Sequence, residues 1–320
     1  MRDENAISLA LVADDFYAAP LATCGLSVIE NLSPDRHLNL FVVDAGLSER
    51  NKRRIAKSLE FPNLHLHYVK PKESTLEHVS LAGSYSISVC YRLLLPSVLP
   101  RNIGKVIYLD SDLIALGNLE DLWSLDFEGT LMLAAQDAAQ REIGNAKHLA
   151  QLPASFLEKN KNEKYLNSGV LVLDLEKWRR EEVSERIIEF LSAHEDLAYP
   201  DQDALNIVLA GRWRELGPQW NQIAVLHDYS RWDQSPYPED IFASALKDPH
   251  IIHYTSYPKP WMLRCDHPQK AIFNEYLQKT AWGDPVTKYV SKAEILGKRI
   301  SRRLAKPRIQ DRLKPAGTKE

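Results

Sequence analysis

Apolar runs alternate with longer amphipathic segments along the first 70 residues of the chain. Short apolar runs cover residues 7–13, 38–43 and 64–69, and two helix-like stretches separate them, one ending near Asn31 and one spanning residues 48–59. Runs of this length suit buried strands, and the segments between them are long enough for helices that cross back over a sheet. The pattern predicts a βαβαβ unit.

The rest of the chain continues the alternation. Residues 85–95 are helix-like and are expected to stop at Pro96, after which KVIYLD at 105–110 indicates a buried strand that ends in an acidic turn. Residues 169–173 and 249–254 predict two more strands, and residues 176–193 and the segment that begins at Pro200 predict helices. No repeat and no Gly/Ser linker interrupts this pattern, so residues 1–283 are predicted to form one α/β catalytic domain.

Composition places the chain among ordinary globular proteins. Its 320 residues are 44% hydrophobic and 26% charged, which argues against fibrous and intrinsically disordered classes. Cys24, Cys90 and Cys265 lie far apart, so neither a disulfide framework nor a CxxC metal knuckle is expected, and a reducing compartment fits best. The first apolar run is too short for a signal peptide, and no run approaches the roughly 20 residues of a membrane span. A cytoplasmic location is therefore expected.

Charge separates the last residues from the body of the chain. Residues 286–320 contain 11 Lys or Arg against 3 Asp or Glu, a net charge of +8, which leaves −11 for the rest. In this segment apolar residues recur at helical spacing, namely Tyr289, Ala293, Leu296, Ile300 and Leu304. Residues 284–320 are therefore predicted to form a basic amphipathic helical tail suited to peripheral contact with an anionic membrane, such as the inner face of the plasma membrane. A solvated basic tail is the alternative.

Two acidic residues follow the strand predicted to end at residue 109. Asp110 and Asp112 are separated by one residue, so an extended segment directs both carboxylates to the same side, where they can share one cation. Ligands of open α/β sheets bind beyond the carboxyl ends of strands. That position favours a metal site, and an acidic surface turn is the alternative.

His253 and Lys259 offer further groups for such a site. An imidazole beside two carboxylates gives a mixed nitrogen and oxygen ligand set with open positions, which favours Mn²⁺ over an all-oxygen cage. A lysine ammonium could meet a phosphate, and together with a metal it would neutralise a departing diphosphate. The alternatives are a structural histidine and a solvated lysine.

Two more acidic segments lie at predicted strand and helix ends. ADDFY at 13–17 follows the first strand and offers two acids and an aromatic face to a nucleoside, but Asp14 or Asp15 could equally cap the next helix. PDQD at 200–203 opens a helix, where acidic side chains are favourable with or without a ligand. The residues alone leave both interpretations open for both segments.

Six segments, taken in order, resemble the motif series of glycosyltransferase family 8, most closely that of its bacterial lipooligosaccharide α-galactosyltransferases. They are ADDFY, YRLLLP, VIYLDSDLI, LNSGVLVLDLEKWRR, YPDQDALN and HYTSYPKPW, and the resemblance extends from Ile7 to about Trp282. It implies a GT-A fold, in which helices flank a Rossmann-like mixed sheet. It also implies transfer of galactose or glucose from a UDP-hexose to a glycan or lipid-linked saccharide, with retention of anomeric configuration, in lipopolysaccharide or cell-envelope polysaccharide biosynthesis.

The resemblance assigns site residues by motif position. Asp110, Asp112 and His253 would hold the metal, expected to be Mn²⁺ with Mg²⁺ as the alternative, and Lys259 would hold the diphosphate. The uridine would be bound by Asp14, Asp15 and Tyr17. The positions around the donor sugar would be Arg92, Asp137, Asn167, Ser168, Asp201 and Gln202, and Ala13, Ser111 and Ser256 would belong to the same donor site.

By the same resemblance, Gln202 would lie nearest the reacting carbon. An amide oxygen is a poor nucleophile but can stabilise an oxocarbenium-like centre, so front-face attack is favoured, and Asp201 is the reserve candidate for a covalent role. Two residues depart from the family pattern. Phe16 replaces an asparagine near the nucleotide, and Ser256 replaces a glycine that would allow close backbone approach in the phosphate loop.

Other functions are less well supported by the sequence. GxGxxG and GxxxxGK[ST] are both missing, which argues against a dehydrogenase or a P-loop enzyme. The acidic body lacks a basic face with interleaved aromatic residues, so nucleic acid is not expected as a partner. A catalytically weak or inactive paralogue that binds UDP-sugar is the alternative within the family, and a turnover assay separates it from an active enzyme.

The basic tail generates a prediction about membranes. Deleting residues 286–320 should abolish sedimentation with anionic liposomes and preserve activity on a soluble acceptor, because each basic residue contributes roughly 1 kcal/mol near an anionic surface. Added salt should weaken the binding of the full chain. Unchanged liposome binding by the truncated protein would refute membrane attachment through the tail.

Overall fold

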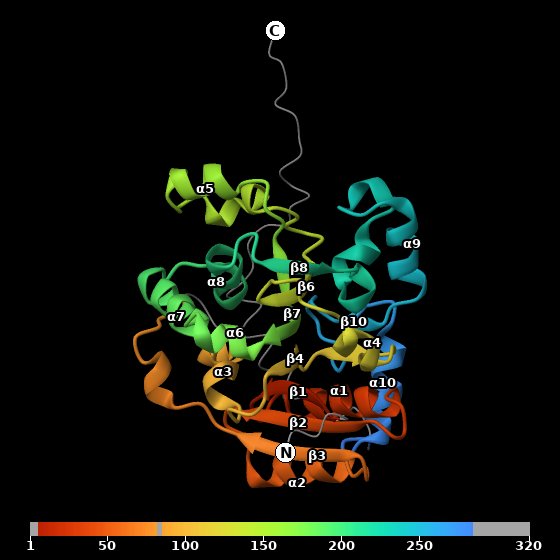
Figure 1. Cartoon of the computed structure of the whole chain (residues 1–320). Coiled ribbons are helices and arrows are strands. Elements are labelled where there is room, and N and C mark those ends of the chain that lie inside the picture. Colours follow the sequence, from red (N-terminus) through yellow and green to blue (C-terminus); the bar gives the residue numbers. More distant parts are fainter. Residues whose placement is uncertain (1–5, 82–84, 284–320) are drawn as a thin grey trace. The chain divides into compact units, whose positions relative to one another are not determined.

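A mixed seven-stranded sheet forms the centre of the described part of the chain (Figure 1). Its strands are β1 (Ala6–Ala13), β2 (His37–Asp44), β3 (Leu64–Val69), β4 (Lys105–Leu109), β6 (Met132–Gln136), β7 (Leu166–Asp174) and β8 (Trp213–Leu216). They pair in the order β3-β2-β1-β4-β7-β6-β8. Strands β3, β2, β1 and β4 are parallel, β7 runs antiparallel to both of its neighbours, and β8 is parallel to β6. The central strands are apolar along nearly their whole length because both faces of the sheet are covered there.

A second, three-stranded sheet lies next to the end of β4. It contains β5 (Leu113–Ala115), β10 (Ile251–His253) and β9 (Gln222–Ile223), paired in the order β5-β10-β9. In the antiparallel pairing of β10 with β5, His253 stands opposite Leu113. The backbone N–H of Tyr254 donates to the carbonyl of Asp112 at 3.1 Å, which extends the pairing by one hydrogen bond. This small sheet therefore brings the end of β10 beside the loop that follows β4.

Ten α-helices and several short 3-10 helices surround the sheets in the described residues. The α-helices are α1 (Ala18–Glu30), α2 (Glu49–Ser58), α3 (Leu95–Val98), α4 (Leu119–Ser124), α5 (Ala154–Asn160), α6 (Leu175–Arg180), α7 (Val183–Ala193), α8 (Pro200–Val208), α9 (Glu239–Lys247) and α10 (Lys270–Lys279). The 3-10 helices are η1 (Glu73–Leu76), η2 (Ile87–Leu94), η3 (Ile143–Asn145), η4 (Lys147–Leu149), η5 (Pro218–Trp220), η6 (Ala224–Asp228) and η7 (Trp232–Gln234). Figure 1 shows α6, α7 and α8 grouped beside the β4–β7–β6 part of the sheet, and α1 and α10 together beside β1.

The largest hydrophobic core joins the sheet to α3, α6, α7 and α8. Tyr108, Leu171, Trp178 and Ile187 are all at most 1% exposed within it. The indole N–H of Trp178 donates to the carbonyl of Leu131 at 3.0 Å, so its one polar group is satisfied inside the core. This packing fixes α8 against β7, where the polar residues of both elements meet.

Most elements predicted from the sequence are confirmed, and two predictions were wrong in detail. The strands predicted at 7–13, 38–43 and 64–69 correspond to β1, β2 and β3. Residues 176–193 form two helices, α6 and α7, because Glu182 adopts the left-handed conformation with φ 49° and breaks the helix. Pro96 does not end a helix. It lies in the first turn of α3, where its missing N–H costs no hydrogen bond.

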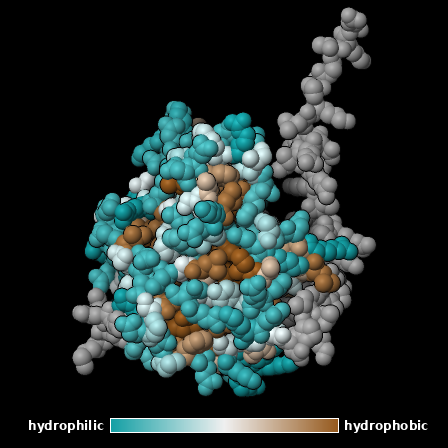
Figure 2. All heavy atoms as spheres, turned by 90° about the vertical axis from the view of Figure 1, so that its right-hand side faces the viewer, coloured by the Kyte–Doolittle hydropathy of each residue, from teal (hydrophilic) through white to brown (hydrophobic). Residues whose placement is uncertain are grey.

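The structure, a computed structural model, describes residues 6–81 and 85–283. These belong to one unit that extends from Met1 to Asp284, and the tail predicted at 284–320 lies outside the described residues. None of the described helices has the length and apolarity needed to cross a bilayer. On the face that carries α4, α9 and α10, hydrophobic patches are separated from one another by hydrophilic residues (Figure 2).

Candidate active site

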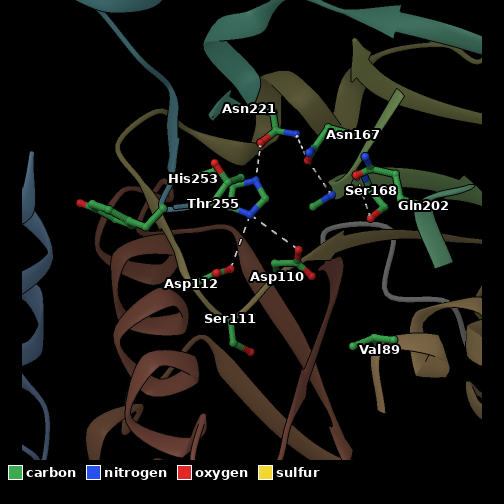
Figure 3. A network of polar contacts seen from close by, with 12 residues as sticks. Val89, Asp110, Ser111, Asp112, Asn167, Ser168, Gln202, Asn221, His253 and Thr255 are labelled. Atoms are coloured by element: carbon green, nitrogen blue, oxygen red, sulfur yellow. Dashed lines mark hydrogen bonds and ion pairs between the residues drawn. The ribbon is translucent and has the colours of Figure 1, made fainter. Parts of the chain in front are cut away.

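Asp110, Asp112 and His253 meet where β4 and β10 end (Figure 3). One ligand atom from each of the three side chains lies within 4.8 Å of the other two. The Nε2 atom of His253 is 3.5 Å from Asp112 Oδ1 and 3.7 Å from Asp110 Oδ2. These separations are long for hydrogen bonds and suit three ligands arranged around one cation. The set of two carboxylates and one imidazole fits Mn²⁺ by its donor atoms.

Each carboxylate keeps one oxygen for this cluster and has the other held by the protein. Asp110 Oδ1 accepts from the Tyr108 hydroxyl at 2.6 Å and lies 2.8 Å from Arg92 Nη2. Asp112 Oδ2 accepts from Lys259 Nζ at 2.5 Å. Burial alone would raise the pKa of Asp112, but the Lys259 ammonium, together with His253, outweighs it and holds that pKa below its ordinary value. Both carboxylates are thus oriented before any ligand binds.

Gly169 allows the His253 ring to lie against β7. A Cβ atom at position 169 would come within 2.2 Å of His253 Cε1 and 2.6 Å of Nδ1. Such separations are far below van der Waals contact, and the ring is 4% exposed and surrounded by protein. Only glycine fits at this position, and the sequence motif LNSG contains it without revealing why.

Arg92 connects two acidic groups of the site. Its Nη2 lies 2.8 Å from Asp110 Oδ1 and its Nε lies 3.2 Å from Asp201 Oδ2. Its Nη1 donates to the carbonyl oxygen of Ser168 at 2.9 Å, and the guanidinium stacks over the Tyr108 ring at 4.8 Å. Burial disfavours the charge, but Asp110 and Asp201 outweigh this and raise the pKa of Arg92. In this structure Arg92 holds the carboxylates of Asp110 and Asp201 in place.

Asp201 and Gln202 lie in the first turn of helix α8 and point toward β7. Asp201 Oδ2 accepts from the Ser168 hydroxyl at 3.0 Å, and Gln202 Oε1 accepts from the Ser168 N–H at 2.9 Å. Gln202 Nε2 lies 3.3 Å from Asp137 Oδ2. Burial raises the pKa of Asp201, although Arg92 opposes this effect. Both residues are in the first turn of α8, so a favourable position for acidic side chains and a ligand-binding role of PDQD are compatible.

One cavity of about 500 Å³ contains most of the predicted residues. The predicted residues in its lining are Arg92, Asp110, Asp112, Asp137, Asn167, Ser168, Asp201, Gln202, His253, Ser256 and Lys259. Tyr85 and Tyr199, which are 44% and 43% exposed, also line it and were not predicted. Exposed aromatic residues in a cavity wall indicate a binding site, but the sequence does not show that these two tyrosines lie in one wall.

The residues predicted to bind uridine lie at the adjacent strand end, outside that lining. Asp14 Oδ1 accepts from the N–H groups of Phe16 and Tyr17, both at 2.9 Å, so it stabilises the turn before α1. Asp15 Oδ1 accepts from the Ser48 N–H at 2.6 Å, at the start of α2. The N-cap of α1 is Tyr17, so the interpretation that Asp14 or Asp15 caps this helix was wrong.

Ala13 and Ser111 connect this region to the cluster of Asp110, Asp112 and His253. Ala13 is the last residue of β1, which pairs with β4 next to Asp110. The Ser111 hydroxyl donates to the carbonyl of Val12 at 2.7 Å, and Figure 3 shows its side chain on the opposite side of the cluster from Asn221. The turn at 14–17 therefore lies next to the loop that holds Asp110 and Asp112.

Charge in the cavity favours a divalent cation. Four carboxylates that are buried or half-buried line it with two cationic side chains: Asp110, Asp112, Asp137 and Asp201, against Arg92 and Lys259. Two negative charges are left over, and uncompensated charge is costly away from water. A divalent cation at the cluster would balance them.

Comparison with known proteins identifies the family. The family model described as "Glycosyl transferase family 8" matches residues 8–265. The chain belongs to glycosyl transferase family 8. The resemblance found in the six sequence motifs is thereby confirmed.

Among curated proteins, this glycosyltransferase is 27% identical over 286 residues to general stress protein A of Bacillus subtilis, covering 88% of this chain and 96% of that protein. It is 25% identical over 264 residues to a lipopolysaccharide 1,2-glucosyltransferase of Escherichia coli K12, covering 81% of this chain and 75% of that protein.

Solved structures of glycosyltransferases share the fold. The galactosyltransferase LgtC, solved in complex with donor and acceptor sugar analogs, matches with a TM-score of 0.72 and 25% identity, over 86% of this chain and 96% of that one. The bifunctional glycosyltransferase WbbM matches with a TM-score of 0.75 and 20% identity, over 91% of this chain and about half, 53%, of that longer one. The GT-A fold predicted for this glycosyltransferase is confirmed.

The contact between Gly169 and His253 generates a prediction. Gly169→Ala should displace the imidazole and weaken Mn²⁺ binding by about tenfold or more, the usual effect of disturbing the support of a metal ligand. Isothermal titration calorimetry on the purified protein measures this affinity. Gly104→Ala is the matched control, because its added Cβ would meet the flexible carboxyl end of Glu176. Equal Mn²⁺ affinity in Gly169→Ala and wild type would show that the ring is not a ligand or that it moves freely.

Proposed function

We propose that this glycosyltransferase is a retaining, metal-dependent enzyme that moves galactose or glucose from a UDP-sugar to a glycan acceptor in lipopolysaccharide or cell-envelope polysaccharide biosynthesis. The observation that carries the proposal is the cluster of Asp110, Asp112 and His253 in one cavity with Asp137, Asp201 and Gln202. Similarity to a lipopolysaccharide glucosyltransferase and to a galactosyltransferase supports the sugar and the pathway.

Asp110, Asp112 and His253 are the proposed ligands of the metal, with Mn²⁺ preferred and Mg²⁺ as the alternative. The free carboxylate oxygens and His253 Nε2 all face one point, which supports this role. A bound divalent cation would act as a Lewis acid toward the diphosphate of the UDP leaving group. The ordered carboxylates bring this electrostatic stabilisation to the site without reorganisation during the reaction.

Lys259 is the proposed diphosphate contact. Its ammonium lies on the rim of the cavity between Asp112 Oδ2, at 2.5 Å, and the carbonyl of Tyr254, at 2.6 Å. A lysine ammonium carries three donors, so one donor is left for a phosphate oxygen when these two contacts are kept. Ser256 lines the same rim, and its hydroxyl is exposed and can donate to the phosphates.

The donor sugar is proposed to lie against β7 and the start of α8. Asp137, Asn167, Ser168 and Gln202 line this wall and present acceptors and donors to sugar hydroxyl groups. Tyr85 and Tyr199 on the open side offer aromatic faces to the acceptor sugar. The uridine would extend from the metal toward the turn at 14–17.

Front-face attack is the mechanism that the contacts favour. In it the acceptor hydroxyl oxygen bonds to the anomeric carbon while the bond to UDP breaks. The bonding electrons pass to the leaving phosphate oxygen, which also accepts the hydroxyl proton. Asp201 is less suited to a covalent role because Arg92 and the Ser168 hydroxyl hold its Oδ2. The Gln202 amide is positioned by Ser168 and Asp137, so it can stabilise positive charge at the sugar without adjusting.

The first test uses purified protein, a panel of UDP-sugars and a measurement of UDP release. Turnover should require a divalent cation and be highest with Mn²⁺. Asp110→Ala, Asp112→Ala and His253→Ala should each abolish it, because the leaving diphosphate loses its electrostatic stabilisation. Full activity in excess EDTA would contradict the predicted requirement for a metal. UDP binding without turnover on any sugar and acceptor tested would instead identify an inactive UDP-sugar-binding paralogue.

The second test separates the roles of Gln202 and the nucleotide contacts. Gln202→Ala should lower kcat by about 10²-fold or more and leave UDP affinity near the wild-type value, because the amide acts on charge that develops at the sugar. Steady-state kinetics and calorimetric UDP binding give the two quantities. Loss of UDP binding with kcat unchanged at saturation would mean that Gln202 belongs to the nucleotide site.

A further inference from the structure

We propose that Asn221 is a positioning residue that fixes the tautomer and orientation of His253, so that Nε2 presents its lone pair to a metal. Asn221 follows η5 and precedes β9, and it is 3% exposed. Its Oδ1 lies 2.8 Å from His253 Nδ1 (Figure 3). The inference rests on the metal site of the proposed function, and the experiments below can fail separately from that function.

A chain of side-chain amides sets the direction of this hydrogen bond. Asn221 Nδ2 donates to Asn167 Oδ1 at 2.9 Å, and Asn167 Nδ2 donates to Asp137 Oδ2 at 3.0 Å. Asn167 Oδ1 also accepts from the backbone N–H of Gly169 at 3.0 Å. Figure 3 shows this line of contacts running from His253 through Asn221 to Asn167.

Two groups of fixed polarity contact Asn167, and this removes the usual ambiguity of amide orientation. The Gly169 N–H can only donate, so the atom of Asn167 that faces it is oxygen. The Asp137 carboxylate, when ionised, can only accept, so the atom of Asn167 that faces it is nitrogen. Asn167 oxygen must then receive a hydrogen from Asn221, which directs Asn221 oxygen at His253.

An oxygen facing Nδ1 requires a hydrogen on Nδ1. In the neutral imidazole the second nitrogen, Nε2, then carries a lone pair. Nε2 is the atom that faces Asp110 and Asp112, at 3.7 Å and 3.5 Å, beyond the 2.7–3.2 Å of ordinary N–H···O bonds. The geometry is that of a metal ligand whose other nitrogen is held by a hydrogen-bond acceptor.

The same chain links the metal side of the cavity to the sugar side. Asp137 Oδ2, which ends the chain, is also 3.3 Å from Gln202 Nε2. Asn167 and Gly169 are both in β7, and Gly169 lies against the His253 ring. Asn221 is therefore the residue that connects the His253 ring to the polar side chains of β7 and α8 in the cavity wall.

The main experiment measures Mn²⁺ affinity by calorimetry, in the absence of substrate. Asn221→Leu, which removes the acceptor at similar volume, should lower the affinity about 10–100-fold. Asn221→Asp keeps an acceptor for Nδ1–H but loses the donor to Asn167 Oδ1, so its Mn²⁺ affinity should exceed that of Asn221→Leu. Gln222→Leu is the matched control. Gln222 is the next residue, fully buried, and donates to the carbonyl of Ala245, away from His253. It should keep wild-type affinity.

A second measurement reads the tautomer directly and needs no stable Asn221 variant. In metal-free wild-type protein with ¹⁵N-labelled histidine, the ring nitrogens of His253 should show the Nδ1–H form, assigned through the signal that His253→Gln removes. Asn221→Leu should shift the ring toward the Nε2–H form or a mixture. Dominance of the Nε2–H form in the wild type would overturn the proposal even if Asn221→Leu failed to fold.

The outcomes distinguish this proposal from the proposed function. Wild-type Mn²⁺ affinity in a folded Asn221→Leu variant would refute the positioning role and leave the metal site in place. If wild-type protein binds no Mn²⁺ or Mg²⁺, the metal part of the proposed function fails, and the Nδ1–H tautomer remains testable by the labelled spectrum. Loss of affinity in Gln222→Leu equal to that in Asn221→Leu would show that any disturbance next to β9 suffices, and would also refute a specific role for Asn221.

Discussion

The buried contact of Arg92 with Asp110 and Asp201 is the interaction on which the active site depends. One guanidinium lies between a carboxylate that follows β4 and another in the first turn of α8, and it also holds the backbone of β7 through Ser168. Removing one partner of a buried ion pair is strongly destabilising, because the remaining charge stays away from water. The position of α8, and with it the position of Gln202, is therefore tied to the loop that carries the proposed metal ligands Asp110 and Asp112.

The part of the site that lies in contiguous motifs could be predicted from the sequence. Asp110 and Asp112 follow an apolar strand, and the end of a parallel strand is a place where ligands bind. The strands β1, β2 and β4 could be predicted from continuous apolar runs, because both of their faces are buried, and α2 from its amphipathic pattern. The pairing of His253 with the two carboxylates came from family resemblance, since about 140 residues separate them in the chain.

The remaining features depend on contacts between distant segments. Asn221 lies in a segment without regular periodicity, and its role becomes visible only when His253 and Asn167 are next to it. A glycine such as Gly169 ordinarily weakens a strand. Its role becomes clear only from the fold, because the His253 ring lies where a Cβ atom would be. The break between α6 and α7 could not be predicted from a Gly or Pro, because a glutamate, Glu182, adopts the left-handed conformation there.

The pairing of β10 with β5 fixes the face of the small sheet from which His253 projects. The register that places His253 opposite Leu113 spans three residue pairs, and a slip by one residue would turn the imidazole to the other face of the small sheet. Residues 224–248 lie between β9 and β10, and three of them, Ala224, Val225 and Asp228, line the cavity. The segment packs against the small sheet, because Gln222 donates to the carbonyl of Ala245 and Ile223 shares a hydrophobic core with Leu226 and Phe242. The small sheet that orients His253 therefore also supports one wall of the same cavity, so both parts of the candidate site share one scaffold.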